Sequence, residues 1–139
     1  MAVSDLVQNF HASFLSLGTN IENKEANLHR ALSMLGKGGK VEVIKTSNFY
    51  QTAPQNFTKQ EDFLNCACEI KTTLSPIFLL KFCKSLESKL GRQETFRYGP
   101  RLIDVDILLY DNLKISASKL TIPHPELTHR NFVLTPLNE

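Results

Sequence analysis

The chain has 139 residues, 42% of them hydrophobic, and a formal net charge of +2. This size and apolar content suit one domain that spans residues 1–139 and builds its own core, and the mild charge argues against a general nucleic-acid binder. Three cysteines without C-x-x-C spacing argue against a disulfide framework or a zinc site, so we expect reduced thiols and a cytoplasmic protein. We also expect neither a secretory signal nor a membrane span.

The predicted elements follow one another without an internal repeat or a linker. Residues 1–10 match no strong pattern, which leaves a flexible N-terminal extension and a short extra turn as alternatives. The chain from Leu120 onward is expected to be irregular. Between these limits, hydrophobic spacing and turn residues predict a strand at 11–17, a helix at 23–35, a β-rich run at 41–50, a strand at 63–72, a helix from 75 to 91, a strand at 103–110 and a short strand at 114–115.

The order βαββαβ predicts the fold class. It is typical of an α+β sandwich of ferredoxin-like type, with a mainly antiparallel sheet and the helices on its face. The lysine-rich part of the second helix is interpreted as a solvated face, on which Glu87 pairs with Lys84. The buried stripe of the same helix is predicted to contain Ile77, Leu79, Leu80, Cys83, Leu86 and Leu90.

The most informative positions are Asp104 and Asp106, two apart in a predicted strand, so that their carboxylates project from the same face. Two close carboxylates in an apolar segment repel each other unless a cation lies between them. Magnesium with phosphate oxygens around it would meet that need, and nearby arginines at 92, 97 and 101 match phosphate geometry. The alternative is a strand end with solvated aspartates and ordinary surface arginines.

Two further groups of residues are weaker signals. Prolines on both sides of His124 fix its backbone, and this imidazole with Arg130 could bind a polyphosphate; the alternative is a histidine in a proline-rich surface turn. Phe63 and Asn65 share one face of a predicted strand and combine an aromatic plane with an amide. Such a pair suits a flat heteroaromatic ring, and the alternative is a core phenylalanine beside a turn-capping asparagine.

Taken together, these stretches resemble the 6-hydroxymethyl-7,8-dihydropterin pyrophosphokinase family of folate biosynthesis. The signature R-x-G-P-R-x-x-D-[aliphatic]-D, followed by aliphatic residues, matches residues 97–108. Four shorter motifs are also present: S-L-G-T-N, S-x-x-Y-x-T-x-P, D-F-L-N and P-H-P-x-x-x-x-R-x-F-V-L-x-P-L. The match runs from about Ser13 to Leu137, and five ordered motifs argue strongly against chance similarity.

The resemblance implies transfer of pyrophosphate from ATP to the hydroxymethyl group of the pterin, with release of AMP. It assigns two Mg²⁺ ions to Asp104 and Asp106, and a catalytic role to this pair together with Arg92 and Arg101. It places contacts with ATP on Lys84, Glu87, Arg92, Arg97, Arg101, Ile107, Lys119, Thr121, His124 and Arg130. It places contacts with the pterin on Phe63, Asn65 and Phe132 and, through backbone groups, on Gly18, Thr52, Ala53 and Gln55.

The chain departs from the family at some positions. Tyr98, Lys84 and Pro125 stand where an enterobacterial-type member has a larger aromatic residue, a glutamine and a tyrosine, which alters nucleotide contacts but spares the metal pair. The early ending after Leu137 fits a truncated chain or a domain cut from a fusion with another folate enzyme. As a lone domain we expect a monomer that binds small molecules and neither nucleic acid nor membrane. The rival interpretation is a non-catalytic, ferredoxin-like module that binds a nucleotide or another ligand.

Overall fold

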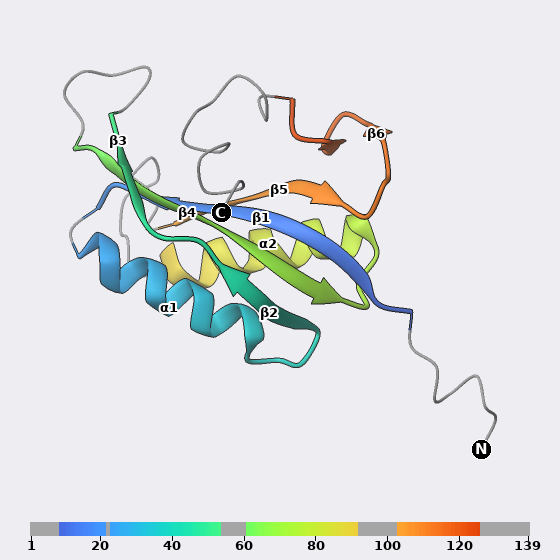
Figure 1. Cartoon of the computed structure of the whole chain (residues 1–139), viewed down its shortest axis with the longest axis horizontal. Helices are drawn as coiled ribbons and strands as arrows, with labels where there is room; N and C mark the ends of the chain where they lie inside the picture. The colour runs from blue at the N-terminus through green and yellow to red at the C-terminus, as the bar shows by residue number, and fades with distance from the viewer. Residues whose placement is uncertain (1–8, 22, 54–60, 92–102, 126–139) are drawn as a thin grey trace.

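A computed structural model describes residues 9–21, 23–53, 61–91 and 103–125 of the chain (Figure 1). The sheet has the strand order β2-β4-β1-β5, with β3 also paired to β4, and all of its pairings are antiparallel. A separate two-stranded ribbon joins β6 and β7. The elements are β1 (His11–Thr19), α1 (Lys24–Gly36), β2 (Val41–Thr46), β3 (Tyr50–Thr52), β4 (Phe63–Thr72), α2 (Pro76–Gly91), β5 (Asp104–Tyr110), β6 (Ile115–Ser116) and β7 (Thr121–Ile122).

Both helices lie against the same face of the sheet (Figure 1). Helix α1 packs on β1, β2 and β4, whereas α2 packs on β5 and on α1. Between helices and sheet lies the hydrophobic core, which includes the fully buried Leu15, Leu17, Leu28, Leu35, Ile70 and Leu79. The predicted α+β sandwich with a mainly antiparallel sheet is therefore confirmed. In the described part of the chain, neither helix is both long and apolar enough to cross a membrane.

Two local predictions are wrong, and a third, the β-rich run, is confirmed with an interruption. Ile77 is 47% exposed, because it lies about 200° around the helix from the buried Leu79. The β-rich run at 41–50 is divided into two strands, β2 and β3. Ser47 occupies the break and still binds β4, because its Oγ accepts from the N–H of Ala67 at 2.9 Å. The segment after Leu120 contains strand β7, which has only two residues and therefore shows no readable periodicity.

Strand β5 contains a bulge. Ile107 pairs with Leu15 of β1, whereas Leu109 pairs with the preceding Phe14, so Leu108 is an extra residue in the ladder. The carbonyl oxygen of Leu108 accepts a hydrogen bond from the N–H of His124 at 2.9 Å. The bulge thus attaches the segment after β7 to the edge of the sheet.

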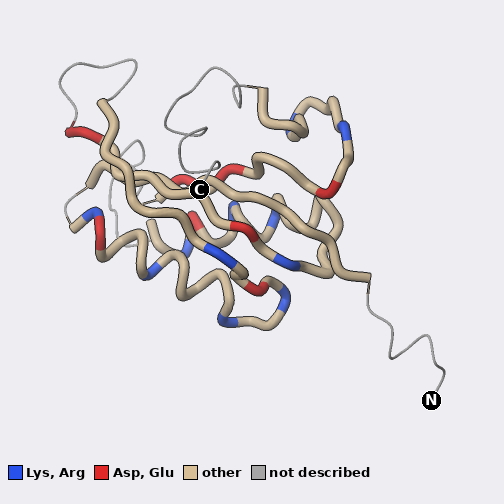
Figure 2. Tube along the Cα trace, in the orientation of Figure 1, with Lys and Arg blue, Asp and Glu red and all other residues tan. Residues whose placement is uncertain are grey.

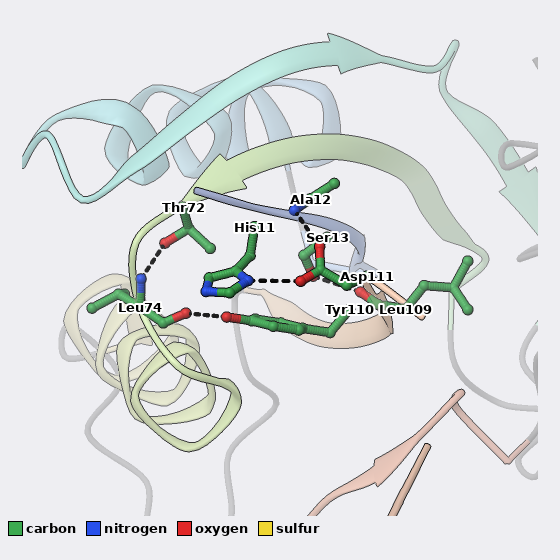
Figure 3. A network of polar contacts seen from close by, with 8 residues as sticks. All are labelled: His11, Ala12, Ser13, Thr72, Leu74, Leu109, Tyr110 and Asp111. Carbon is green, nitrogen blue, oxygen red and sulfur yellow. Dashed lines mark hydrogen bonds and ion pairs between the residues drawn. The ribbon is translucent and has the colours of Figure 1, made fainter. Parts of the chain in front are cut away.

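A polar network ties the start of β1 to the end of β5 (Figure 3). The carboxylate of Asp111 contacts Nδ1 of His11 at 2.6 Å and accepts from the N–H of Ala12 at 2.8 Å. Asp111 has a φ of 46°, and its own N–H donates to the carbonyl oxygen of Ala12 at 2.7 Å. The hydroxyl of Tyr110 donates to the carbonyl oxygen of Leu74, which lies just before α2. This end of the sheet is closed by contacts within the chain.

Candidate active site

The two aspartates of β5 lie on the sheet face that the helices leave open. The alternating residues Val105 and Ile107 are buried in the core, so Asp104 and Asp106 point the other way, as predicted. Asp104 is exposed and Asp106 is partly buried. Opposite them on β1 stand Gly18 and Ser16. Gly18 has no side chain, and that of Ser16 is short.

Asn65 lies in the same row of the sheet as the carboxylate pair. Gly18 of β1 is the register partner of Asn65 on one side and of Asp104 on the other. A Cβ atom at Gly18 would lie only 2.6 Å from Oδ1 of Asn65, so the position of this amide requires glycine there. The amide nitrogen Nδ2 donates to Oγ1 of Thr52 at 2.8 Å. Thr52 was predicted to line the pterin pocket through its backbone. Its side chain also contacts Asn65, another predicted pterin residue.

The remaining predicted pterin residues are only partly described. Phe63 is half-buried at the start of β4, where it pairs with Thr52 of β3. Ala53, the residue after Thr52, is exposed. Gln55 and Phe132 lie outside the described residues. The structure therefore brings Gly18, Thr52, Phe63 and Asn65 together at one end of strands β1, β3 and β4.

A pocket of about 250 Å³ opens beside β5. Five of the predicted ATP residues line it together with the predicted metal ligand Asp106: Lys84, Ile107, Lys119, Thr121 and His124. They come from α2, from β5 and from the segment around β7, so residues far apart in sequence meet here. The arginines at 92, 97, 101 and 130 lie outside the described residues, and their predicted roles on the phosphates stay predictions.

The pocket also contains residues outside the predicted site, among them Pro125, which was noted only as a departure from the family pattern. Leu80, Ser118, Leu120 and Pro125 complete its described lining, together with Val105. Leu80 was predicted only as a core residue, and Ser118 belongs to no motif. Ser16 was missed as the neighbour of Asp106, although it stands two residues before Gly18 in the S-L-G-T-N motif and thus on the same face of a strand.

Glu87 differs from its predicted setting. Its pairing with Lys84 is confirmed, because Nζ of Lys84 lies 3.3 Å from Oε1. The interpretation of Glu87 as part of a solvated face is wrong, since only 5% of its side chain is exposed. Its other oxygen, Oε2, accepts a hydrogen bond at 2.8 Å from the N–H of Val105. The hydrogen bond from this backbone donor compensates for the burial of the carboxylate. Spacing along the sequence could not show this contact.

The donor set at the aspartates fits a hard divalent cation that shares its shell with a substrate. Among the described residues, no three His, Cys, Asp or Glu side chains are grouped so that they could hold a metal ion by themselves. Two carboxylates on one strand face match the usual manner of binding Mg²⁺, in which a few carboxylates act with phosphate oxygens and water.

The three cysteines do not supply a nucleophile. Cys66, Cys68 and Cys83 are free thiols buried in the core, and Cys83 belongs to the buried stripe predicted for its helix. Burial raises the pKa of Cys66 and that of Cys83 to about 12. Burial also raises the pKa of Cys68. Thiolates are therefore scarce at neutral pH.

The described part of the chain carries charged residues of both signs. Basic and acidic positions are interspersed along the helices, the strands and the connecting segments (Figure 2). This mixture agrees with the low net charge of +2.

The comparison with protein families decides where this chain belongs. The model of the 7,8-dihydro-6-hydroxymethylpterin-pyrophosphokinase (HPPK) family matches residues 14–139. The chain belongs to this family. The resemblance inferred from the five motifs is thereby confirmed.

Relatives from several organisms agree with this family. The chain is 42% identical over 127 residues to the "Bifunctional protein FolKE" of Lactococcus lactis strain IL1403, a match that covers 91% of this chain and 36% of the relative. It is also 42% identical to the "2-amino-4-hydroxy-6-hydroxymethyldihydropteridine pyrophosphokinase" of Bacillus subtilis, over 91% of this chain and 76% of that protein. The chain thus spans about a third of the bifunctional relative and about three quarters of the Bacillus one.

A solved structure shares the fold. The crystal structure of Plasmodium falciparum HPPK-DHPS with pteroate matches with a TM-score of 0.70 at 17% identity, over 95% of this chain and 39% of that chain. At this identity the likeness concerns the fold alone, and it supports the α+β sandwich with its antiparallel sheet.

Proposed function

We propose that this chain transfers pyrophosphate from ATP to the hydroxymethyl group of 6-hydroxymethyl-7,8-dihydropterin and releases AMP. Membership of the family supports this activity. The observation that carries it in the structure is the row formed by Asn65, Gly18 and Asp104 on three neighbouring strands. Asn65 and Asp104 lie about 10 Å apart across this row, twice the usual distance between strands. A pterin held at Asn65 would therefore extend its hydroxymethyl arm toward the aspartates.

Asp104 and Asp106 would hold the Mg²⁺ ions, two of them as the resemblance implies. Their shared face and the small residues Gly18 and Ser16 opposite them support this assignment. When bound, Mg²⁺ neutralises charge on the ATP phosphates and helps to align them. Phosphate oxygens and water would complete the coordination shell.

The residues of the pocket beside β5 would bind the nucleotide. Lys84, Lys119 and His124 bring cationic or hydrogen-bonding groups to its wall, while Ile107 and Leu80 provide apolar surface for a base. Asp106 belongs to the same wall, so a nucleotide in this pocket would present its phosphates to the aspartates. A transfer of this kind depends on positioning and charge neutralisation and needs no protein nucleophile.

The test is to incubate the protein with ATP, Mg²⁺ and 6-hydroxymethyl-7,8-dihydropterin and to quantify AMP and pterin diphosphate by chromatography. We expect the two products in equal amounts, and no AMP when the pterin is omitted. Binding of ATP without formation of AMP would contradict the proposal and would favour a non-catalytic binding module.

We further propose a single pyrophosphokinase domain that acts as a cytoplasmic monomer when it stands alone. The buried free thiols support a reducing compartment. A longer protein that joins this domain to another folate enzyme is the second arrangement, supported by the relative named bifunctional. Sedimentation of the purified chain at two concentrations tests the monomer, and a larger mass at the higher concentration would contradict it.

A further inference from the structure

Glu87 is the buried ionisable residue whose contacts lead directly to the aspartates. It lies on α2, on the side of the helix that packs against β5, and only 5% of its side chain is exposed. Its Oε2 atom accepts from the N–H of Val105 at 2.8 Å. Val105 is the residue between Asp104 and Asp106. The carboxylate of Glu87 is therefore attached to the backbone of the pair.

This contact fills a place that the sheet leaves open. Strand β5 is at the end of the strand order, and Val105 pairs with Leu17 of β1. In an antiparallel ladder, the N–H groups of successive residues point alternately toward and away from the partner strand. The N–H of Val105 points away, toward α2, where a buried donor without an acceptor would destabilise the fold. Glu87 supplies the acceptor.

Lys84 extends the contact to the pocket. Its Nζ atom lies 3.3 Å from Oε1 of Glu87, and its side chain is 51% exposed and lines the pocket beside β5. Both oxygens of the Glu87 carboxylate thus have partners within the chain, one of them a backbone amide and the other a cation. The carboxylate therefore links the backbone between the two aspartates to a cationic residue of the pocket wall.

We infer that Glu87 is a positioning residue: it holds β5 against α2 so that Asp104 and Asp106 keep the spacing and direction that the metal ions need. This inference rests on the proposed function. Partners that orient metal ligands from outside the coordination shell commonly change metal affinity by about 10- to 100-fold when they are removed.

Two substitutions separate the hydrogen bond from the charge. Glu87→Gln keeps an oxygen that can accept from the N–H of Val105 but removes the negative charge beside Lys84. Glu87→Ala removes both. Glu25→Gln on α1 is the matched control, because that side chain is 77% exposed and distant in the fold from β5.

The first measurement is binding of Mn²⁺ in the presence of a non-hydrolysable ATP analogue, followed by electron paramagnetic resonance. We expect about 10-fold or more weaker Mn²⁺ binding in Glu87→Ala, a change of less than about 3-fold in Glu87→Gln, and none in Glu25→Gln. The Mg²⁺ concentration for half-maximal activity should follow the same order. Loss of affinity for the analogue itself at saturating Mn²⁺, with the metal requirement unchanged, would overturn the inference in favour of a direct nucleotide contact.

The second measurement needs no substrate. Amide hydrogen exchange of Val105, followed by NMR in the ligand-free protein, should be at least about 10-fold faster in Glu87→Ala than in wild type and close to wild type in Glu87→Gln. Equal exchange in all variants would overturn the positioning role. If wild type forms no AMP but exchange and Mn²⁺ binding respond as expected, the proposed function fails while the attachment of the aspartates stands. If Glu87→Ala does not fold, Glu87→Gln is compared with wild type, and a 10-fold loss of Mn²⁺ affinity in it would contradict the inference.

Discussion

The two ends of β5 both carry aspartates next to β1, but the surroundings of these aspartates differ. At the C-terminal end, the carboxylate of Asp111 is bound by His11 and by the N–H of Ala12. At the N-terminal end, Asp104 and Asp106 stand opposite Gly18, which has no side chain, and Ser16, which has a short one. The first end is marked by donors from β1 to the carboxylate, and the second by small residues opposite the carboxylates. The first arrangement fastens strands together, whereas the second leaves carboxylates beside a pocket.

The largest expected effect is at the open end. Asp106→Ala should reduce AMP formation by at least about 10²-fold, because it removes a group that would hold the metal and thus the charge on the transferred phosphates. The thermal midpoint should stay within about 2 °C of wild type, since the side chain is only partly buried. The assay measures AMP, and calorimetry measures the midpoint. Unchanged turnover would refute the metal assignment.

A smaller loss is expected from Gly18→Ala. The new Cβ would meet Oδ1 of Asn65 at 2.6 Å, so the amide must turn and give up its hydrogen bond to Thr52. We expect about 10-fold weaker pterin binding by calorimetric titration, with affinity for the ATP analogue unchanged. Gly38→Ala is the control, because a Cβ there meets nothing within 4 Å. Equal pterin affinity in wild type and Gly18→Ala would show that Asn65 does not read the ring.

At the fastened end, substitutions should change stability and leave activity intact. Tyr110→Phe removes the hydroxyl that donates to the carbonyl oxygen of Leu74 and leaves that oxygen without this partner. We expect a loss of about 1 kcal/mol in the free energy of unfolding, measured with denaturant, and a kcat within 2-fold of wild type. A large fall in kcat at unchanged stability would mean that the two ends are not separate in function.

The smallest effect concerns pH. The hydrogen bond with His11, and a second hydrogen bond from the N–H of Ala12, lower the pKa of Asp111 below its ordinary 3.8. The ionised form is thus favoured in the folded state, and its stabilisation is present above pH 3.8 and is lost as the pH falls through the lowered pKa. Asp111→Asn should therefore be less stable than wild type at neutral pH, and the difference should shrink in acid. Denaturant unfolding across this range measures it, and a difference independent of pH would contradict the prediction.

Much of this comparison could be predicted from the sequence. Alternation in β4 and β5 and the proline and glycine at the ends of α2 are local signals, and they placed those elements and the aspartates. The setting of Glu87 could be predicted only in part from local sequence spacing. Its spacing from Lys84 predicted their ion pair, but its acceptor role depends on Val105, which is 18 positions away and meets α2 only in the folded sheet. The partnership of Gly18 with Asn65 likewise depends on strand register, which a single sequence does not reveal.

The bulge at Leu108 has a consequence for how one strand can serve two ends. Along an uninterrupted strand, positions 104, 106, 108 and 110 would have the same parity, and Tyr110 would face the same side as the aspartates. The extra residue resets the frame, so that Tyr110 turns inward to reach Leu74 while Asp104 and Asp106 stay outward. Without that extra residue, either Tyr110 would lose its contact with Leu74 or the two aspartates would lose their outward direction. The bulge therefore allows the seven residues of β5 to carry both the inward-facing Tyr110 and the outward-facing aspartates.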